Sequence, residues 1–281
     1  MKLSSNSLYI VYTPIGNLDD ITLIAIEVLK KSDIILCEDT RHSLKLMSHL
    51  KISKKLVSYH KFNEKKELKN ILEHINKGKI LSIISDAGTP LLSDPGRILI
   101  NECIKEDIKI IPIPGVSSIT TAISVSGFSD QFLFYGFLPK TEKELDKVLS
   151  TLSNQKFSIV FFIPSIKSKF YFYKFRKYFI DRKILIGKEM TKLHEFFFRS
   201  EIKELQNFKN QLKGELTIVI SESAKKKDTL NKEKIINNAK KYLKKYSVKD
   251  TVDLIVKSEK LTKNKKEIYK LCLKLKDEKN I

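Results

Sequence analysis

Residues 79–96 read KILSIISDAGTPLLSDPG, an apolar run followed by a loop of small, acidic and proline residues. The run 79–84 has the length and composition of a buried β-strand. In the loop that follows, Gly88 permits close approach of the backbone to a ligand, and Pro90 stiffens the turn. The stretch therefore predicts a buried strand and a stiff turn, which is either an ordinary tight turn or part of a ligand site.

The first part of the chain repeats this alternation of strand and helix. Residues 22–32 and 65–78 have the apolar spacing of amphipathic helices. This pattern predicts an α/β domain with a largely parallel sheet, which we place at residues 1–117. The further strand candidates are LYIVYTP (8–14), DIILCED (33–39), LVSYH (56–60) and IKIIPIP (108–114).

A second α/β domain is predicted for residues 118–224. Its helix candidates are 140–155 and 165–179. Its strand candidates are FLFYGFLP (132–139), FSIVFFIP (157–164), RKILIGKEM (182–190) and ELTIVISES (215–223). We therefore expect two sheets, one in each domain.

The remainder, residues 225–281, is rich in lysine and has helical periodicity. Ile235, Ala239 and Tyr242 share one helical face, and residues 247–275 read as two helices joined by a turn at LTKN (261–264). This layout is compatible with a helix-turn-helix or with a solvated lysine-rich bundle. We expect a small basic helical appendage.

Positive charge is concentrated in this appendage. The formal net charge of the chain is +20. Residues 225–281 hold 19 Lys against 8 acidic residues, a balance of +11, whereas the other 224 residues hold 34 basic and 25 acidic residues, a balance of +9. A basic surface suits a polyanion such as nucleic acid, although a general bias toward lysine over the five arginines would give the same total.

Several classes of site have no support in the sequence. There is no GxGxxG or GxxxxGK[ST] phosphate loop, no HExxH zinc motif and no GxSxG nucleophile turn. Cys37, Cys103 and Cys272 are far apart and form no CxxC pair, so we expect buried free thiols and no metal site. With no apolar stretch long enough for a membrane span and no secretion signal, the expected location is cytoplasmic.

The loops that follow the strand candidates of the first domain have unusual compositions. In an open α/β sheet, loops at the carboxyl ends of parallel strands converge on one crevice, where ligands bind. The four loops TPIGNLDD, CEDTRH, SDAGTP and PIPG thus predict a cofactor pocket at one edge of the sheet. Backbone groups and a few acids are expected to hold the ligand.

Five linked motifs carry a family resemblance. They are TPIGNLDDIT (13–22), EDTRH (38–42), SDAGTPLLSDPG (85–96), IPIPGVSS (111–118) and EMTKLHE (189–195). With these motifs the chain resembles the tetrapyrrole methylase superfamily, and within it the branch that methylates ribosomal RNA of the small subunit. The similarity spans roughly residues 8–222 and continues more weakly into the tail.

The resemblance implies a fold, a cofactor and a reaction. It implies two α/β domains with S-adenosylmethionine in the cleft between them, in a homodimer. The implied reaction is methylation of the ribose 2'-hydroxyl of a decoding-site cytidine in 16S rRNA of the small ribosomal subunit. The residues that the motifs place at the cofactor are Pro14, Asp86, Ala87, Gly88, Thr89 and Gly115.

Removal of the hydroxyl proton requires a general base near the 2'-oxygen. The two polar motifs supply the candidates, and Arg41 could bind an adjacent phosphate. For each candidate the alternative is a salt bridge or a helix cap. The candidates for the catalytic site are Glu38, Asp39, Arg41, His42, Lys192 and Glu195.

The chain departs from the family pattern in two places. PGVSS stands where PGPSA is common, and FFIPSIKSKF (161–170) replaces a segment of the type YESPHR. The first departure also permits a methylase that acts on a tetrapyrrole intermediate. The second departure leaves open the alternative that the chain is a non-catalytic RNA-binding or ribosome-assembly protein.

Overall fold

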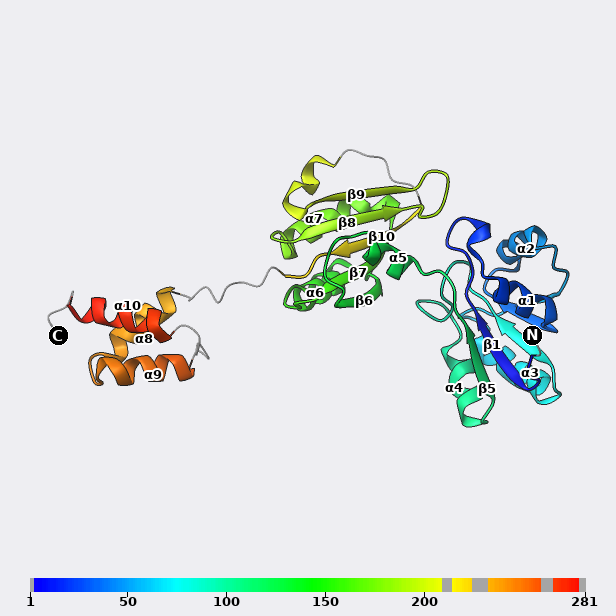
Figure 1. The fold of residues 1–281 in the computed structure, drawn as a ribbon, viewed down its shortest axis with the longest axis horizontal. Helices are drawn as coiled ribbons and strands as arrows, with labels where there is room; N and C mark the ends of the chain where they lie inside the picture. The colour runs from blue at the N-terminus through cyan, green and yellow to red at the C-terminus, as the bar shows by residue number, and fades with distance from the viewer. Residues whose placement is uncertain (1–2, 209–213, 224–231, 259–264, 278–281) are drawn as a thin grey trace. The chain divides into compact units, whose positions relative to one another are not determined.

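The computed structural model describes residues 3–208, 214–223, 232–258 and 265–277. The chain forms two compact units, Met1–Ser223 and Ala224–Ile281. The first unit contains two five-stranded sheets, each with helices on its faces (Figure 1). The two α/β lobes expected from the sequence thus lie within one unit, and the basic tail forms the other.

The first sheet is entirely parallel, with the order β3-β2-β4-β1-β5. It is buried on both faces, because alternate residues of its strands enter different cores. Leu8 and Ile10 pack with α3 and α4, whereas Tyr9 and Val11 pack with α1 and α2. The strands are β1 (Ser7–Val11), β2 (Ile34–Cys37), β3 (Lys55–Ser58), β4 (Ile80–Ile83) and β5 (Lys109–Ile113), and the helices are α1 (Leu23–Lys31), α2 (Thr40–His49), α3 (Glu64–Asn76) and α4 (Arg97–Lys105).

The second sheet is mixed, with the order β6-β7-β10-β8-β9. Only β6 and β7 pair in parallel, and the other neighbours are antiparallel. Side chains of α6 and α7 pack on one face, and α5 covers part of the other. The strands are β6 (Phe132–Phe137), β7 (Ser158–Pro164), β8 (Lys183–Lys188), β9 (Phe196–Glu201) and β10 (Glu215–Ile220), and the helices are α5 (Ser118–Ser124), α6 (Glu142–Ser153) and α7 (Ser168–Tyr178).

The predicted strands are all present. Helix α2 and edge strand β9 were not predicted. Strand β9 follows β8 after a short connection and pairs with it over its whole length. Its sequence, FFFRSE, has no alternation of apolar and polar residues, which is why its pattern was missed.

Arg182 connects three segments at one end of the second sheet by hydrogen bonds. Its side chain is 5% exposed and donates hydrogen bonds to the carbonyl oxygens of Ser153, Gln155 and Ser221. These carbonyls come from the end of α6, the turn after it and the end of β10. A buried guanidinium with several acceptors is satisfied without a carboxylate partner, so Arg182 has a structural role.

The second unit has its own hydrophobic core. Helices α8 (Lys232–Tyr242), α9 (Val248–Ser258) and α10 (Lys265–Asp277) pack through Ile235, Val252 and Ile268. Helices α9 and α10 correspond to the predicted pair, and the turn predicted at 261–264 lies outside the described residues. No helix in the described part of the chain has the length and apolar character required to cross a bilayer.

Candidate active site

The four unusual loops meet at the carboxyl edge of the first sheet. Strands β1 and β4 are neighbours, and their loops are joined by two hydrogen bonds between the backbones of Thr13 and Gly88, of 2.9 and 3.0 Å. The Thr13 hydroxyl donates to the Ser85 carbonyl at 3.0 Å. On the other side of β1, the Tyr12 N–H donates to the carbonyl of Ile113 in β5. The prediction that these loops converge is confirmed.

The loop after β1 also touches the second lobe. The N–H of Asn17 donates to the Thr191 hydroxyl at 2.9 Å. At Gly16 the backbones come so close that an added Cβ would lie 2.7 Å from Thr191 Oγ1 and from Lys192 Cγ, and would overlap the Met190 carbonyl oxygen. The TPIGN and EMTKL segments, predicted as separate motifs, are therefore in direct contact.

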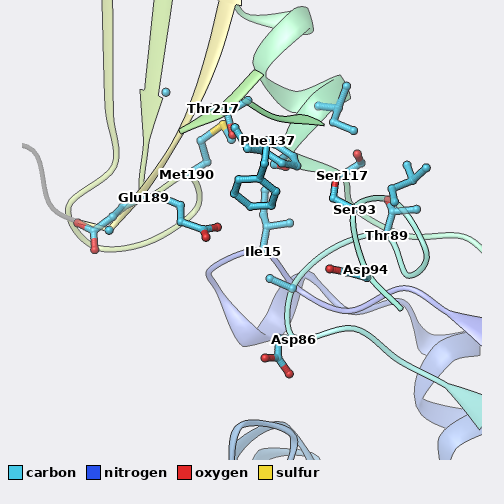
Figure 2. Close-up of a pocket in the computed structure, with 18 of the residues that line it drawn as sticks. Ile15, Asp86, Thr89, Ser93, Asp94, Ser117, Phe137, Glu189, Met190 and Thr217 are labelled. Atoms are coloured by element: carbon cyan, nitrogen blue, oxygen red, sulfur yellow. The ribbon is translucent and has the colours of Figure 1, made fainter. Parts of the chain in front are cut away.

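These loops line a pocket of about 520 Å³, within the range of ligand sites. Figure 2 shows Asp86, Thr89 and Asp94 on the loops of the first lobe, and Phe137 and Met190 on the second. Its other lining residues are Ile15, Glu38, Ala87, Leu92, Ser93, Ser117, Ser118, Ile119, Phe162, Gly187, Glu189, Lys192, Gly214, Glu215 and Thr217.

The pocket is acidic although the chain is basic. Its lining includes five carboxylates and one lysine. Burial, followed by the charges of Glu38, Asp86 and Glu215, raises the pKa of Asp94 to about 7. Burial and the charge of Asp86 also raise the pKa of Glu38. Such a lining favours a cationic ligand and disfavours phosphate groups.

Strained backbone is concentrated in two of the loops that line the pocket. Of the non-glycine residues with positive φ in the described part of the chain, Leu91 and Ser93 lie in the loop after β4, and Glu189 and Thr191 lie in the loop after β8. Each such conformation costs of order 1–3 kcal/mol and persists only when its surroundings enforce it. Both loops are therefore held in specific shapes by tertiary contacts.

The residues predicted to bind the cofactor are at the pocket or directly behind it. Asp86, Ala87 and Thr89 line the pocket. Gly88 has a φ of +77°, a conformation that favours glycine, and its Cβ position is 3.1 Å from Ile15. The residue next to Ile15 is Pro14, which is buried.

Gly115 has a packing reason for lacking a side chain. An added Cβ would lie 2.9 Å from Cβ of Tyr12. Gly115 is not part of the pocket lining, although Ser117 and Ser118 just after it are. Gly115 thus lets the loop after β5 pass close to β1.

The predicted catalytic residues are distributed unevenly. Glu38 and Lys192 line the pocket. Asp39 is the N-cap of α2, accepting from the backbone N–H of Arg41, and hydrogen bonds from Arg41 hold the pKa of Asp39 at about 2. Arg41 is itself 88% exposed. The helix cap and the salt bridge that were the alternative for Asp39 are both observed.

Two further candidates lie outside the pocket lining. His42 is exposed on α2. Glu195 accepts a hydrogen bond of 2.7 Å from the N–H of Thr191 and so shapes the loop that carries Lys192. His42 thus has a surface position, and Glu195 a contact within its own loop.

Sequence reasoning missed most of the second lobe's contribution. Phe137 comes from β6, and Glu215 and Thr217 come from β10, where nothing in the local sequence marks them. Met190 lies within the motif EMTKLHE but was not named as a candidate. Asp94 lies within the motif SDAGTPLLSDPG but was not named as a candidate. The described residues contain no group of His, Cys, Asp or Glu arranged to hold a metal ion, and the three cysteines are buried and free.

The fold of the two α/β lobes is shared with solved methyltransferases. A cobalt precorrin-4 methyltransferase shares the fold with a TM-score of 0.56 and 19% identity over 77% of this chain and 95% of its own. A uroporphyrin-III C-methyl transferase from Thermus thermophilus, complexed with S-adenosyl homocysteine, gives a TM-score of 0.56 and 14% identity over 76% of this chain and 97% of its own. At these identities the likeness concerns the fold.

The family model for Tetrapyrrole (Corrin/Porphyrin) Methylases matches residues 7–206, so the chain belongs to this family of methyltransferases. Two relatives, both ribosomal RNA small subunit methyltransferase I, narrow the group. The one from Thermotoga maritima is 42% identical over 76% of this chain and 97% of its own, and the one from Rickettsia prowazekii is 40% identical over 96% and 98%. Within the family, the chain is a member of the ribosomal RNA small subunit methyltransferase I group.

The cofactor of this methyltransferase is S-adenosylmethionine, and the pocket fits it. The cofactor carries a sulfonium and an ammonium group, for which the acidic lining provides opposite charge. Gly88, whose Cβ position is 3.1 Å from Ile15, lets the loop after β4 pair with the loop after β1 behind the pocket. Thr89 and Ser117 add hydroxyl groups that can bind polar parts of the cofactor.

Proposed function

We propose that this methyltransferase acts on the ribose 2'-hydroxyl of a decoding-site cytidine in 16S rRNA of the small ribosomal subunit. The observation that carries the proposal is the pocket formed by the family's own motifs, with carboxylates available as a proton acceptor. The names of the relatives support ribosomal RNA as the substrate. The location of the cofactor beside Asp86, Ala87 and Thr89 is part of the same proposal.

In methyl transfer the main task of the protein is to position the acceptor oxygen relative to the methyl group. S-adenosylmethionine supplies an electrophilic methyl group when bound. The lining residues must hold the acceptor oxygen in line with that group, and most of the rate can come from this alignment. Lys192 is available to orient the ribose or a phosphate at the mouth, and Glu38 to orient the cofactor or the acceptor.

Contacts with the RNA backbone are proposed for surfaces outside the acidic pocket. Phosphates are repelled by its carboxylates, so a single flipped or unpaired nucleotide would enter while its neighbours stay outside. The exposed Arg41 is a candidate for a neighbouring phosphate. We further propose that the protein is a homodimer, as the family resemblance implies.

The test is methyl transfer from radiolabelled S-adenosylmethionine to purified small ribosomal subunits, followed by mapping of 2'-O-methyl positions. We expect label at one cytidine of the decoding site. Label on a base, or at another nucleotide, would contradict the proposed acceptor. Cofactor binding without label would point to a tetrapyrrole substrate, and neither binding nor label to a non-catalytic RNA-binding protein.

The basic second unit is expected to add RNA affinity and to leave the cofactor site unchanged. The described helices α8, α9 and α10 carry exposed lysines, including Lys240, Lys266 and Lys270. Deleting residues 224–281 should weaken binding to small-subunit RNA about tenfold or more at 0.1 M salt and flatten the dependence of affinity on salt. Fluorescence anisotropy over a salt series measures both quantities.

A full-length variant distinguishes the effect of the lysine charges from the effect of losing the whole second unit. Lys266→Gln with Lys270→Gln should shift the salt dependence in the same direction by a smaller amount, while calorimetry shows unchanged affinity for S-adenosylmethionine. If a folded truncated chain keeps the RNA affinity and the salt slope of the full chain, the lysines only solvate the unit.

A further inference from the structure

The loop of residues 91–96 presents a carboxylate that has no structural role. Asp94 lies just before helix α4, where an aspartate would ordinarily cap the helix. The N-cap of α4 is instead Gly96, and no side chain caps this helix. Among the described residues, the Asp94 carboxylate has no hydrogen-bonding or ion-pairing partner, yet it lines the pocket (Figure 2). A half-buried, unpaired carboxylate is costly, so its retention points to use by a ligand.

The loop is held rigidly from several sides. Leu91 and Ser93 both have positive φ, at 72° and 70°. The N–H of Gly96 donates to the buried carboxylate of Glu64 at 3.4 Å. From the second lobe, the β6 backbone at Gly136 approaches so closely that an added Cβ would lie 2.9 Å from Ser93 Oγ. Both lobes thus fix the position of Asp94, which is what a group acting on a reacting atom requires.

The other pocket carboxylates differ from Asp94 in their surroundings. Asp86 accepts a hydrogen bond of 3.4 Å from the N–H of Asp39. Glu189 is paired with Lys188 at 3.4 Å. Among the residues that the structure describes, Glu38 and Glu215 line the pocket without such partners, but neither lies in a loop that both lobes brace in this way.

Resting on the proposed function, we propose that Asp94 is the catalytic residue that accepts the proton of the ribose 2'-hydroxyl. As the O–H bond breaks, its proton moves to a carboxylate oxygen of Asp94. The oxygen forms the bond to the methyl carbon, and the S–CH3 bond breaks with its electron pair left on sulfur. The cofactor thereby becomes S-adenosylhomocysteine, and Asp94 returns its proton to water after release of product.

The charges around Asp94 support this role. Burial and the carboxylates of Glu38, Asp86 and Glu215 raise its pKa to about 7, so near neutral pH it accepts a proton readily and still releases it. The other charged groups that line the pocket are Glu189 and Lys192, from the loop after β8. Lys192 and the cationic cofactor both favour the ionised form and so shift the working pKa downward.

The experiment is Asp94→Asn in the full chain, with Asp107→Asn as the matched control. Asp107 is exposed at the turn after α4, where asparagine tolerates the same positive φ. We expect Asp94→Asn to lower kcat for small-subunit RNA about 10²–10³-fold, with KM and cofactor affinity changed less than about threefold. The wild-type rate should fall as pH drops below the working pKa, and the variant's residual rate should lack this dependence.

Each outcome decides the assignment. A variant that keeps more than half of kcat, or keeps the wild-type pH profile, overturns it. Loss of cofactor affinity by the same factor as turnover would make Asp94 a binding residue and also overturn it. The proposed function fails separately, if the wild-type protein itself does not methylate a 2'-hydroxyl of the RNA.

Discussion

Replacing Gly16 by alanine is expected to weaken binding of S-adenosylmethionine about 10–100-fold. The added methyl would overlap the Met190 carbonyl oxygen and press on Thr191 Oγ1, where the two lobes touch. Overpacking of this kind costs about 1–3 kcal/mol, and here it is relieved by moving the loops that line the pocket. Since 1.4 kcal/mol corresponds to about a tenfold change in affinity, displacement of these loops should lower the affinity for the cofactor by the expected factor. Isothermal titration calorimetry with the cofactor measures the effect.

Gly127→Ala is the matched control for this change. Gly127 has a φ of +73°, but an added Cβ would have no atom within 4 Å. The control should therefore lose some stability through backbone strain and keep its cofactor affinity. If Gly16→Ala binds the cofactor as tightly as the wild type, the contact between the TPIGN loop and Thr191 does not set the geometry of the bound pocket.

The second large effect concerns stability, and its sign is opposite to the effect on turnover. Without cofactor, Asp94→Asn should raise the free energy of unfolding at pH 8 by about 1–2 kcal/mol, because the half-buried carboxylate is ionised at this pH and solvent screens only part of the penalty. The physical reason is that burial, followed by the charges of the neighbouring carboxylates, disfavours the ionised form of Asp94. The measurement is urea unfolding of both proteins at several pH values.

The pH dependence follows from the raised pKa. Asp94 is neutral in both states below its ordinary pKa of 3.8 and contributes nothing there. Between about pH 4 and 7 the unfolded chain loses this proton while the folded protein keeps it, so stability falls as pH rises. Above about 7 the penalty is constant. The difference between wild type and variant should therefore grow from pH 4 to 7 and then level off.

Equal stabilities of the two proteins at every pH would contradict this account of the pocket. Asp107→Asn should show no such pH-dependent difference, because its carboxylate is exposed. A variant that is more stable and less active cannot owe its lost turnover to misfolding. The stability measurement therefore excludes misfolding as the cause of a lower kcat in the kinetic experiment.

Much of the fold was predictable from local patterns. Buried parallel strands leave continuous apolar runs such as 80–83, and the helices between them leave a spacing of three and four residues. Convergence of the loops after β1 and β4 also followed, because parallel strands end at one edge of their sheet. The family resemblance rested on the same loops, since their glycines and prolines are demanded by backbone geometry.

The candidate site was predicted in part, for reasons that individual residues show. Asp86 and Thr89 follow a buried strand in a distinctive loop, so their position at the pocket could be anticipated. Asp39 carried the same sequence signal, but local hydrogen bonds with Arg41 engage its carboxylate. A sequence motif does not distinguish a carboxylate that caps a helix from one that faces a ligand.

The sequence by itself determined the two α/β lobes, the basic helical tail and the loops at the edge of the first sheet, because these depend on contacts within short segments. Only the tertiary structure decided that Gly16 meets Met190, that Gly136 packs against Ser93, and that Asp94 lies in one pocket with four other carboxylates. Such contacts join residues far apart in the chain, and their energies arise from close approach, burial and summed charge. None of these quantities is a property of a local sequence pattern, which is why the acidic pocket became visible only in the folded protein.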